Sequence, residues 1–276
     1  MASPRTATVV IRPSSGWIGL GAIELWKHRD LAYFLVWRDL KVRYKQTAFG
    51  AAWAVLQPVL LMLVFSAFLG QIKGIGSSDV PYPLFALSGL VPWTLFSQSL
   101  SGASNSLVNS QNLISKVYFP RLLLPLSAVA SYVIDFLIAA VVLVIAMLFF
   151  GRVPPATFLL VPLLGLFAVV VALAVGLWLA AINVRYRDVK YAIPFLIQLW
   201  LFASPVAYSS DLVPSGLRPL LSLNPMTGVI NGFRWAALGG PRPDLTILVS
   251  AAATVVILLG GLAYFRRVER TFADTI

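Results

Sequence analysis

Charged residues are unevenly spaced along the chain and leave long uncharged tracts between them. Five tracts carry no Asp, Glu, Lys or Arg, over residues 46–72, 80–115, 153–184, 191–210 and 245–265, and a sixth, over 122–151, is interrupted only by Asp135. Each tract is long enough to cross the hydrocarbon of a membrane as a helix, which takes about 20 residues. The pattern predicts an all-α integral membrane fold with six transmembrane helices, at about 49–71, 83–106, 123–149, 158–182, 190–209 and 245–265.

Ahead of the first predicted span, residues 24–45 mix aromatic and basic side chains at helical spacing. One stripe of this helix would carry Tyr33, Val36, Trp37, Leu40 and Tyr44, with Arg38, Lys41 and Lys45 beside it. Such a helix is expected to lie in the membrane interface, with its aromatic rings at headgroup level and its basic groups toward phosphate or water. It serves either as an anchor alone or also as a docking element for a cytoplasmic partner.

Between the fifth and sixth spans, residues 210–244 are too interrupted by charge to form another span. Asn224 followed by Pro225 is typical of a helix N-cap and first turn, and predicts a helix through Leu238 that ends at the glycines 239–240. Residues 215–221 are expected to form a shorter helix before it. The pair either re-enters the membrane as gate helices at the exit of a pathway or forms a surface hairpin.

Composition supports the membrane assignment and suggests an orientation. The chain has 276 residues, of which 59% are hydrophobic and 11% charged, and its mean hydropathy is +0.87. With a cytoplasmic N-terminus, 16 of the 21 basic residues fall in predicted inner segments, as the positive-inside rule requires. We therefore expect a cytoplasmic tail over 1–23, one transmembrane domain over 24–276 and two cytoplasmic termini. The net charge of +11 then needs no nucleic-acid partner.

Several polar and aromatic residues fall inside the predicted spans. Thr94, Gln98, Ser101 and Asn105 share one face of the second span, and they act either as hydrogen-bonding contacts between helices or as the wall of a hydrophilic conduit. Phe65 and Trp200 are aromatic candidates for stacking on sugar rings if they line that conduit. Asp135 lies deep in the third span with no basic residue predicted at its depth, which leaves a structural hydrogen-bonding role or a proton relay.

The residues and motifs that commonly serve catalysis or metal binding are scarce in the sequence. There is no cysteine and only one histidine, and no glycine is followed directly by lysine, so the phosphate-binding loop of ATPases is absent. No two acidic residues lie within four positions of each other, which weakens local schemes for binding a metal ion. We therefore predict no catalytic residue, no metal site and no cofactor bound by this chain.

Six sequence motifs stand out along the chain. They are RDLKVRYKQTAFGAAWAVLQPV at 38–59, LISKVYFPRLLLPL at 113–126, NVRYRD at 183–188, SPVAYS at 204–209, NPMTGVINGFRWA at 224–236 and ERTFADTI at 269–276. Together they resemble the membrane subunit of type 2 ABC exporters, and most closely the permeases for O-antigen, capsule or teichoic acid. The resemblance runs from about residue 30 to the C-terminus. It implies a homodimeric permease of the bacterial cytoplasmic membrane, paired with two copies of a separate ATPase that holds ATP and magnesium.

The resemblance also implies a substrate and roles for particular residues. The substrate would be a polysaccharide, commonly carried on undecaprenyl diphosphate and moved from the cytoplasmic to the outer face. ATPase coupling would fall to Asn112, Lys116, Tyr118, Phe119, Pro120 and Arg121 in one loop, and to Arg185, Arg187 and Asp188 in a second. The lipid diphosphate or gate interface would use Arg38, Lys41, Arg43, Tyr44 and Lys45, and the outer gate would use Asn224, Pro225, Phe233 and Arg234. A lipid or drug exporter permease is the alternative within the superfamily, and a secondary transporter or a prenyl-phosphate enzyme is the alternative outside it.

Overall fold

The computed structural model describes residues 22–45, 52–72, 74–76, 79–240, 242–243 and 245–269. Its helices are α1 (Ala22–Lys27), α2 (Arg29–Lys45), α3 (Ala52–Phe68), α4 (Tyr82–Asn109), α5 (Gln111–Ile114), α6 (Leu123–Phe149), η1 (Ala156–Leu160), α7 (Val161–Arg185), α8 (Val189–Phe202), η2 (Ser210–Leu212), α9 (Arg218–Leu223), α10 (Pro225–Leu238) and α11 (Thr246–Glu269). No strand occurs among these residues, so the predicted all-α fold is confirmed. The predicted tail over 1–23, the motif over 269–276 and the start of the first span lie largely outside the described residues.

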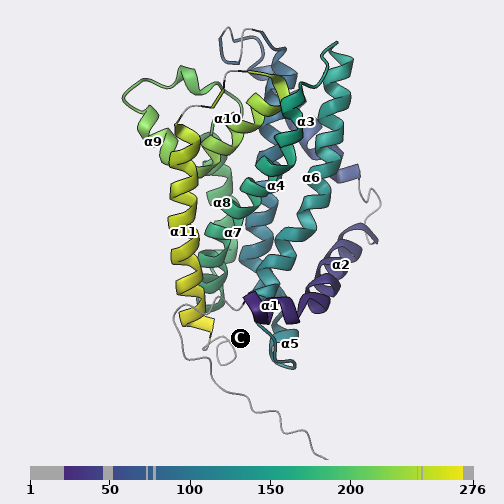
Figure 1. The fold of residues 1–276 in the computed structure, drawn as a ribbon, viewed down its shortest axis with the longest axis vertical. Helices are drawn as coiled ribbons and strands as arrows, with labels where there is room; N and C mark the ends of the chain where they lie inside the picture. The colour runs from purple at the N-terminus through teal and green to yellow at the C-terminus, as the bar shows by residue number, and fades with distance from the viewer. Residues whose placement is uncertain are drawn as a thin grey trace, which may run out of the picture.

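The long helices form a bundle around α4, which contacts α3, α6, α7, α8 and α10 (Figure 1). Along most of its length α4 is buried, and its fully buried side chains include Leu84, Leu87, Phe96 and Leu100. Gly176 of α7 lies against α4, where an added Cβ would come within 2.8 Å of the Ala103 side chain. Small residues at such contacts let helices pack closely in a membrane.

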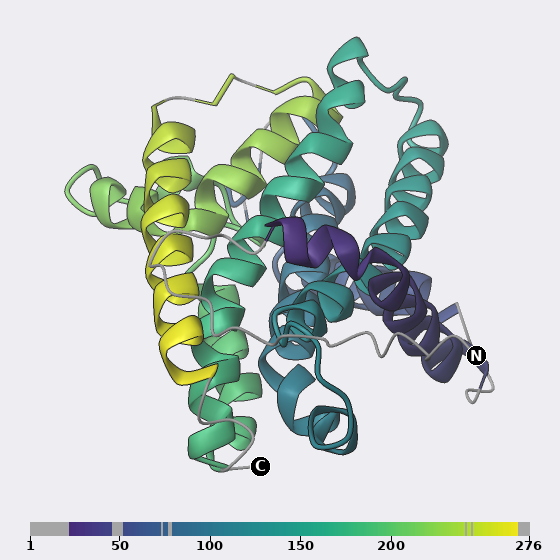
Figure 2. The ribbon, with the colours of Figure 1, turned by 60° about the horizontal axis from the view of Figure 1, so that its bottom comes forward.

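The bundle has two distinct ends. α1 and α5 lie at one end, which we call the α5 end, whereas α9 and α10 lie at the other, the α10 end (Figure 1). Figure 2, with the α5 end turned forward, shows α1 and α2 running across the bundle rather than along it. The predicted inner and outer loops therefore separate onto opposite ends.

Within the part of the chain that the structure describes, three helical segments are long and apolar enough to cross a membrane, namely α6, residues 156–185 through η1 and α7, and α11. α4 is of similar length, 28 residues, but carries many hydroxyl and amide side chains. α3 and α8 are shorter, with 17 and 14 residues. At 1.5 Å per residue, α8 covers about 21 Å, which is less than the roughly 30 Å of membrane hydrocarbon.

The predicted fifth span, 190–209, is therefore wrong in its length. α8 ends at Phe202, and residues 203–206 form turns, of which 204–206 are buried. Pro205 has no backbone N–H to continue the helix. The carbonyls of Pro205 and Val206 instead accept hydrogen bonds from Arg234 of α10.

Two other predictions of local structure can be compared directly. The predicted helix pair between the fifth and sixth spans is confirmed as α9 and α10. The Asn224 side chain accepts a hydrogen bond from the Met226 backbone N–H, and Gly239 ends α10 in the left-handed conformation with φ of 72°. The predicted interface helix over 24–45 is present but interrupted at His28, where α1 ends and α2 begins.

Candidate functional site

The predicted coupling loop forms an exposed element at the α5 end. After α4 the chain makes the short helix α5 and then an irregular segment that leads into α6. Asn112, Lys116 and Tyr118 are exposed there, and Tyr118 retains 82% of its accessible surface. Phe119 points inward and is only 5% exposed, within a cluster that includes Ile114 and Leu35. The exposed residues are therefore available to a partner, whereas Phe119 holds the loop to its own chain.

The coupling loop is also tied to the end of α11. The Arg121 backbone N–H donates to a Glu269 carboxylate oxygen over 3.1 Å, and the Arg121 guanidinium donates to the Glu269 carbonyl. Pro120, just before, is half-buried. A movement of this loop would therefore be transmitted to α6 and α11 together.

The second predicted coupling segment joins α7 to α8 at the same end of the bundle (Figure 1). Arg185, Arg187 and Asp188 are all exposed there. The two predicted coupling segments thus carry exposed residues at the same end of the bundle.

Asp135 has an ionic partner that sequence reasoning missed. The Arg43 guanidinium from α2 donates to one Asp135 carboxylate oxygen over 2.5 Å, and the Tyr44 hydroxyl donates to the other. The two side chains of the ion pair are 28% and 12% exposed. The expectation that no basic residue lies at the depth of Asp135 is therefore wrong. The expectation failed because α2 runs obliquely, so that its last turn, which carries Arg43, packs against the middle of α6.

The surroundings of Arg43 hold its guanidinium in place. It donates a second hydrogen bond to the Ser131 hydroxyl over 2.6 Å and lies 3.8 Å above the Tyr132 ring. Tyr132 packs in turn on α4 at Gly102, where an added Cβ would lie 2.5 Å from the ring. This Arg43–Asp135 contact joins α2, α6 and α4, and it supports the structural interpretation of Asp135 over a proton relay.

The remaining basic residues of α2 are placed differently from Arg43. Lys41 and Lys45 are exposed. Arg38 is also exposed and forms an ion pair with the neighbouring Asp39 at 2.9 Å. Of the five predicted diphosphate-interface residues, Arg43 and Tyr44 therefore face α6, and the other three remain accessible for an anionic headgroup.

The polar face of α4 mostly makes contacts between helices or with its own backbone. The Asn183 side chain of α7 donates to the Asn105 side chain over 3.2 Å and to the Ser104 carbonyl over 3.0 Å. Thr94 is buried and donates to a carbonyl of its own helix, and Ser101 is half-buried. This part of the face therefore acts as the predicted contact between helices.

Gln98 differs from the other members of this face. Its amide donates to the Gln57 side chain of α3 over 2.9 Å, and Gln57 is exposed on the protomer. Two amide groups at the surface of an apolar bundle are costly against lipid. Gln98 is therefore the predicted conduit-wall residue whose side chain reaches toward the bundle surface, where it meets Gln57.

The two aromatic candidates pack largely within the bundle. Phe65 is half-buried against the main core. The Trp200 indole N–H donates to the Asn224 side chain over 2.9 Å, and its ring meets Phe96 edge-on at 5.1 Å. Asn224 also donates to the Ala203 carbonyl, so it connects the end of α8 to the start of α10. Trp200 thus holds Asn224, the N-cap of α10, in place.

Arg234 forms the centre of the α10 end. It is 9% exposed, donates to the Pro205 carbonyl over 2.6 Å and to that of Val206, and lies 3.7 Å above the Phe85 ring. Gly89 makes room for this arrangement, because an added Cβ would lie 2.8 Å from the guanidinium and 2.7 Å from the Val206 carbonyl oxygen. Carbonyl groups left free by the end of α8 are therefore satisfied from α10.

Tyr208 lies near Arg234, and Phe233 and Pro225 are the remaining predicted gate residues. Burial raises the pKa of the Tyr208 phenol, an effect that the nearby Arg234 charge partly opposes, so the phenol stays neutral near pH 7 and supplies no counter-charge. Phe233 and Pro225 are buried, and Phe233 meets Phe136 of α6 edge-on. Three of the four predicted gate residues are therefore buried along α10, and the fourth, Asn224, caps its start.

No group of three or more His, Cys, Asp or Glu side chains that could hold a metal ion occurs among the residues that the structure describes.

Comparison with known proteins places the chain in a family. A sequence profile of the family described as "ABC-2 type transporter" matches residues 31–238. The chain is 32% identical over 257 residues to the O-antigen export system permease protein RfbA of Myxococcus xanthus, covering 92% of this chain and 98% of that protein. A protein of the same name from Klebsiella pneumoniae is 26% identical over 249 residues, covering 90% and 95%.

A third relative extends the comparison to another exported polymer. The polysialic acid transport protein KpsM of Escherichia coli is 24% identical over 238 residues, covering 84% of this chain and 91% of that protein. The profile match alone covers more than half of the chain. The predicted resemblance is therefore confirmed, and the chain belongs to the ABC-2 type transporter family.

Proposed function

We propose that this chain is the permease subunit of an ATP-driven exporter that moves a polysaccharide, carried on a lipid diphosphate of the undecaprenyl type, from the cytoplasm across the inner membrane. The observation that carries the proposal is the similarity to O-antigen export permeases over 92% of the chain. The exposed element at the α5 end gives this assignment a physical basis. We infer that it faces the cytoplasm.

ATP hydrolysis would take place on a separate ATPase subunit. Lys116 and Tyr118 in the first coupling segment and Arg185 and Arg187 in the second are exposed at the same end of the bundle. The segment that follows α5 is held to the bundle, since Phe119 is buried and Arg121 contacts Glu269. A rigid exposed element of this kind can pass a rigid-body movement of the ATPase to the spans behind it.

The polysaccharide path would lie between two copies of the permease. Gln57 of α3 is exposed and accepts a hydrogen bond from the half-buried Gln98 of α4. Polar groups in a membrane face protein or water rather than lipid. We infer that this surface faces a second copy across a hydrated path, with two permeases and two ATPases in the assembly.

The lipid diphosphate would be held at the surface of α2. Arg38, Lys41 and Lys45 are exposed on this helix. Arginine and lysine side chains bind phosphate groups through charge-assisted hydrogen bonds. Binding of bulk anionic lipid would use the same side chains, and therefore the test includes a lipid without a glycan.

The proposal is tested by co-expressing the chain with candidate ATPase subunits and purifying it through a tag on the permease. ATP hydrolysis is then measured in lipid with lipid-linked polysaccharide, with the lipid diphosphate alone, and with neither. A stable complex whose hydrolysis responds to the glycan supports the proposal. A complex that responds only to lipids or drugs would favour the alternative exporter class, and failure to recruit any ATPase would refute the proposal.

A further inference from the structure

Helix α11 runs along the edge of the bundle from the α10 end to the α5 end (Figure 1). Within the part of the chain that the structure describes, its main contacts are with α7, α9 and α10. Its other face is apolar and exposed, and includes Leu248, Val256 and Leu259. A helix that packs on one side only has fewer contacts to break when it tilts as a rigid body.

At the α5 end, α11 is joined to the predicted coupling loop. The Arg121 backbone N–H of the loop donates to a carboxylate oxygen of Glu269, at the end of α11, over 3.1 Å. Phe265, one turn earlier in α11, is fully buried and belongs to the same hydrophobic cluster as Phe119 of the loop. A charged acceptor strengthens a hydrogen bond, and burial of the two rings opposes their separation. A displacement of the coupling loop therefore carries this end of α11 with it.

At the α10 end, α11 is joined to both α9 and α10 through the fully buried Ser250. The Gly228 backbone N–H of α10 donates to the Ser250 hydroxyl over 3.2 Å. The same hydroxyl lies 3.2 Å from the Ser222 carbonyl at the end of α9 and 3.3 Å from the Asn224 carbonyl before α10. Gly228 allows this close approach, because an added Cβ would lie 2.6 Å from the Ser250 Cβ. One side chain of α11 therefore holds the end of α9 and the start of α10.

Between these two ends, α11 is held by Trp178 of α7. The Trp178 indole N–H donates to the Ile257 carbonyl over 3.0 Å. The glycines 260–261 leave room for the indole, because an added Cβ at either position would lie 2.9 Å from it. At 1.5 Å per residue, Ile257 lies about 18 Å along the helix from Glu269 and about 10 Å from Ser250. A tilt of α11 about Trp178 would therefore move its two ends in opposite directions.

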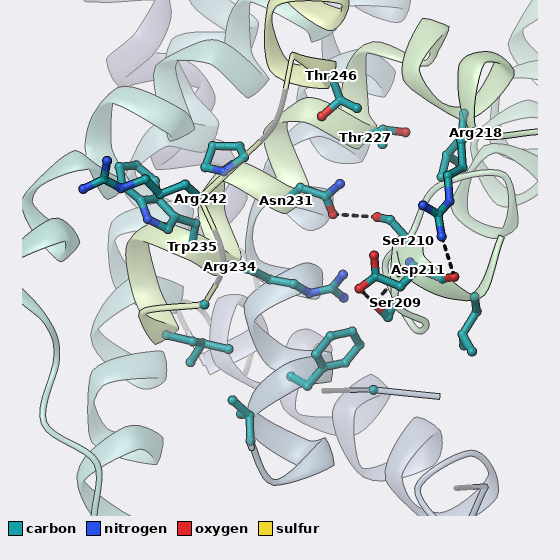
Figure 3. A pocket seen from close by; sticks show the side chains of 18 of the residues that line it. Ser209, Ser210, Asp211, Arg218, Thr227, Asn231, Arg234, Trp235, Arg242 and Thr246 are labelled. Carbon is teal, nitrogen blue, oxygen red and sulfur yellow. Dashed lines mark hydrogen bonds between the residues drawn. The ribbon is translucent and has the colours of Figure 1, made fainter. Parts of the chain in front are cut away.

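A cavity among the segments around the start of α11 leaves them room to move. Its volume is about 560 Å³. Its lining comes from several segments, among them η2, α9, α10 and the start of α11, and includes Ser210, Arg218, Asn231 and Thr246 (Figure 3). Protein interiors otherwise contain few voids larger than a water molecule. A shift at this end of α11 can therefore be accommodated without compressing a packed core.

We propose that α11 is a lever that transmits movement of the coupling loop to α9 and α10 at the opposite end of the bundle. Trp178 is its fulcrum, and Glu269 and Ser250 are the residues that position its two ends. The inference rests on the proposed function, in which an ATPase moves the coupling loop. Hydrogen-bonded contacts and rigid helices that take two discrete arrangements are the physical means by which distant sites are coupled.

The test measures movement of α9 by thiol labelling in the complex of the full chain with its ATPase subunit, in lipid nanodiscs. Leu221→Cys places the only thiol of this chain on α9, at a half-buried position that lines the cavity. The rate of its reaction with a membrane-impermeant maleimide is measured with and without ATP and magnesium. The rate of ATP hydrolysis is measured on the same samples, because a complex that hydrolyses ATP has folded and assembled.

The lever is broken at either end by one substitution. Glu269→Ala removes the acceptor for the coupling loop, and Ser250→Ala removes the hydroxyl that holds α9 and α10. Arg267→Gln is the matched control for the first change, because Arg267 is exposed in the last turn of the same helix. Thr254→Val is the control for the second, because the buried Thr254 hydroxyl donates to a carbonyl of α11 itself.

We expect ATP to change the labelling rate of the parent complex about fivefold or more, since coupling between distant sites usually amounts to about 5–150-fold. In each alanine variant the change should fall to within about twofold while ATP hydrolysis continues, and both controls should keep the parent response. Combining the two alanine changes should have no further effect, because either one already interrupts the lever.

Two results would overturn the lever: a parent labelling rate that does not respond to ATP, or a full response in an alanine variant that hydrolyses ATP. If Glu269→Ala does not assemble, Ser250→Ala at the other end of α11 decides the matter alone. Both results require a working complex with an ATPase, so they leave the proposed function intact. Failure of the parent chain to recruit any ATPase would instead refute the proposed function, and the lever with it.

Discussion

The Arg43–Asp135 contact offers the sharpest test of how α2 is held against the bundle. Asp135→Asn keeps the shape of the side chain and removes its charge. The carboxylate now accepts from the Arg43 guanidinium and from the Tyr44 hydroxyl. After the change, Arg43 keeps the Ser131 hydroxyl and the Tyr132 ring but has lost its counter-charge.

The size of the effect follows from the burial of this pair. A hydrogen bond to a charged group contributes about 1.5–3 kcal/mol, and this pair is largely shielded, with Asp135 12% and Arg43 28% exposed. We expect Asp135→Asn to make detachment of α2 easier by about 2 kcal/mol. At 1.4 kcal/mol per factor of ten, the detached population rises about thirtyfold.

The assay is thiol labelling, which is specific here because the sequence contains no cysteine. Leu40→Cys places a single thiol at a position of α2 that is 8% exposed, and its reaction with a maleimide in nanodiscs reports detachment. The rate should rise about thirtyfold when Asp135→Asn is added, in proportion to the detached population. Asp39→Asn is the matched control on the same helix, because the exposed pair that it breaks with Arg38 contributes little.

A double-mutant cycle then separates the ion pair from general loss of packing. Arg43→Gln in the Asp135→Asn background should change the rate much less than Arg43→Gln alone, because the partner charge is already gone. Additive effects of the two changes would refute the coupling. An Asp135→Asn rate within about twofold of the parent rate would refute the stabilising role of the pair, since that factor corresponds to less than 0.5 kcal/mol.

Three further predictions concern the two ends of the bundle. Gly89→Ala should lower the thermal stability of the chain in nanodiscs by about 1–3 kcal/mol, because the added methyl meets a backbone carbonyl, whereas Gly240→Ala, with open space around it, should not. Asn224→Ala should cost about 1–2 kcal/mol in the same measurement through loss of the α10 cap, and an unchanged melting temperature would contradict this role. Tyr118→Ala should reduce export while leaving stability unchanged, whereas Phe119→Ala should destabilise the chain by about 3–5 kcal/mol, and the opposite pattern would reverse their assigned roles.

Local chemistry was sufficient to predict several elements. The third span was predicted at 123–149, and α6 has these same bounds. The start of α10 at Asn224–Pro225 and its end at Gly239 also followed from local signals. A helix cap and an uncharged tract each depend on residues that are close together in sequence. Both can therefore be recognised without knowledge of the tertiary fold.

The roles of several candidate residues depended on contacts between distant parts of the chain. Phe119 and Tyr118 are adjacent in sequence, yet one is buried and the other exposed. The uncharged tract after residue 190 predicted a full span, although α8 stops at Phe202. Arg234 satisfies the carbonyl groups beyond that point, which the hydropathy of the tract could not reveal.

The sequence by itself determined the class of the protein, because apolar length, charge distribution and local caps are properties of the linear chain. It also identified the family through its motifs. Only the tertiary structure decided that Arg43 meets Asp135, 92 positions away, and that Ser250 of α11 meets Gly228 of α10. Pairing energies depend on distances of a few ångströms, and those distances are set by helix packing rather than by spacing along the chain.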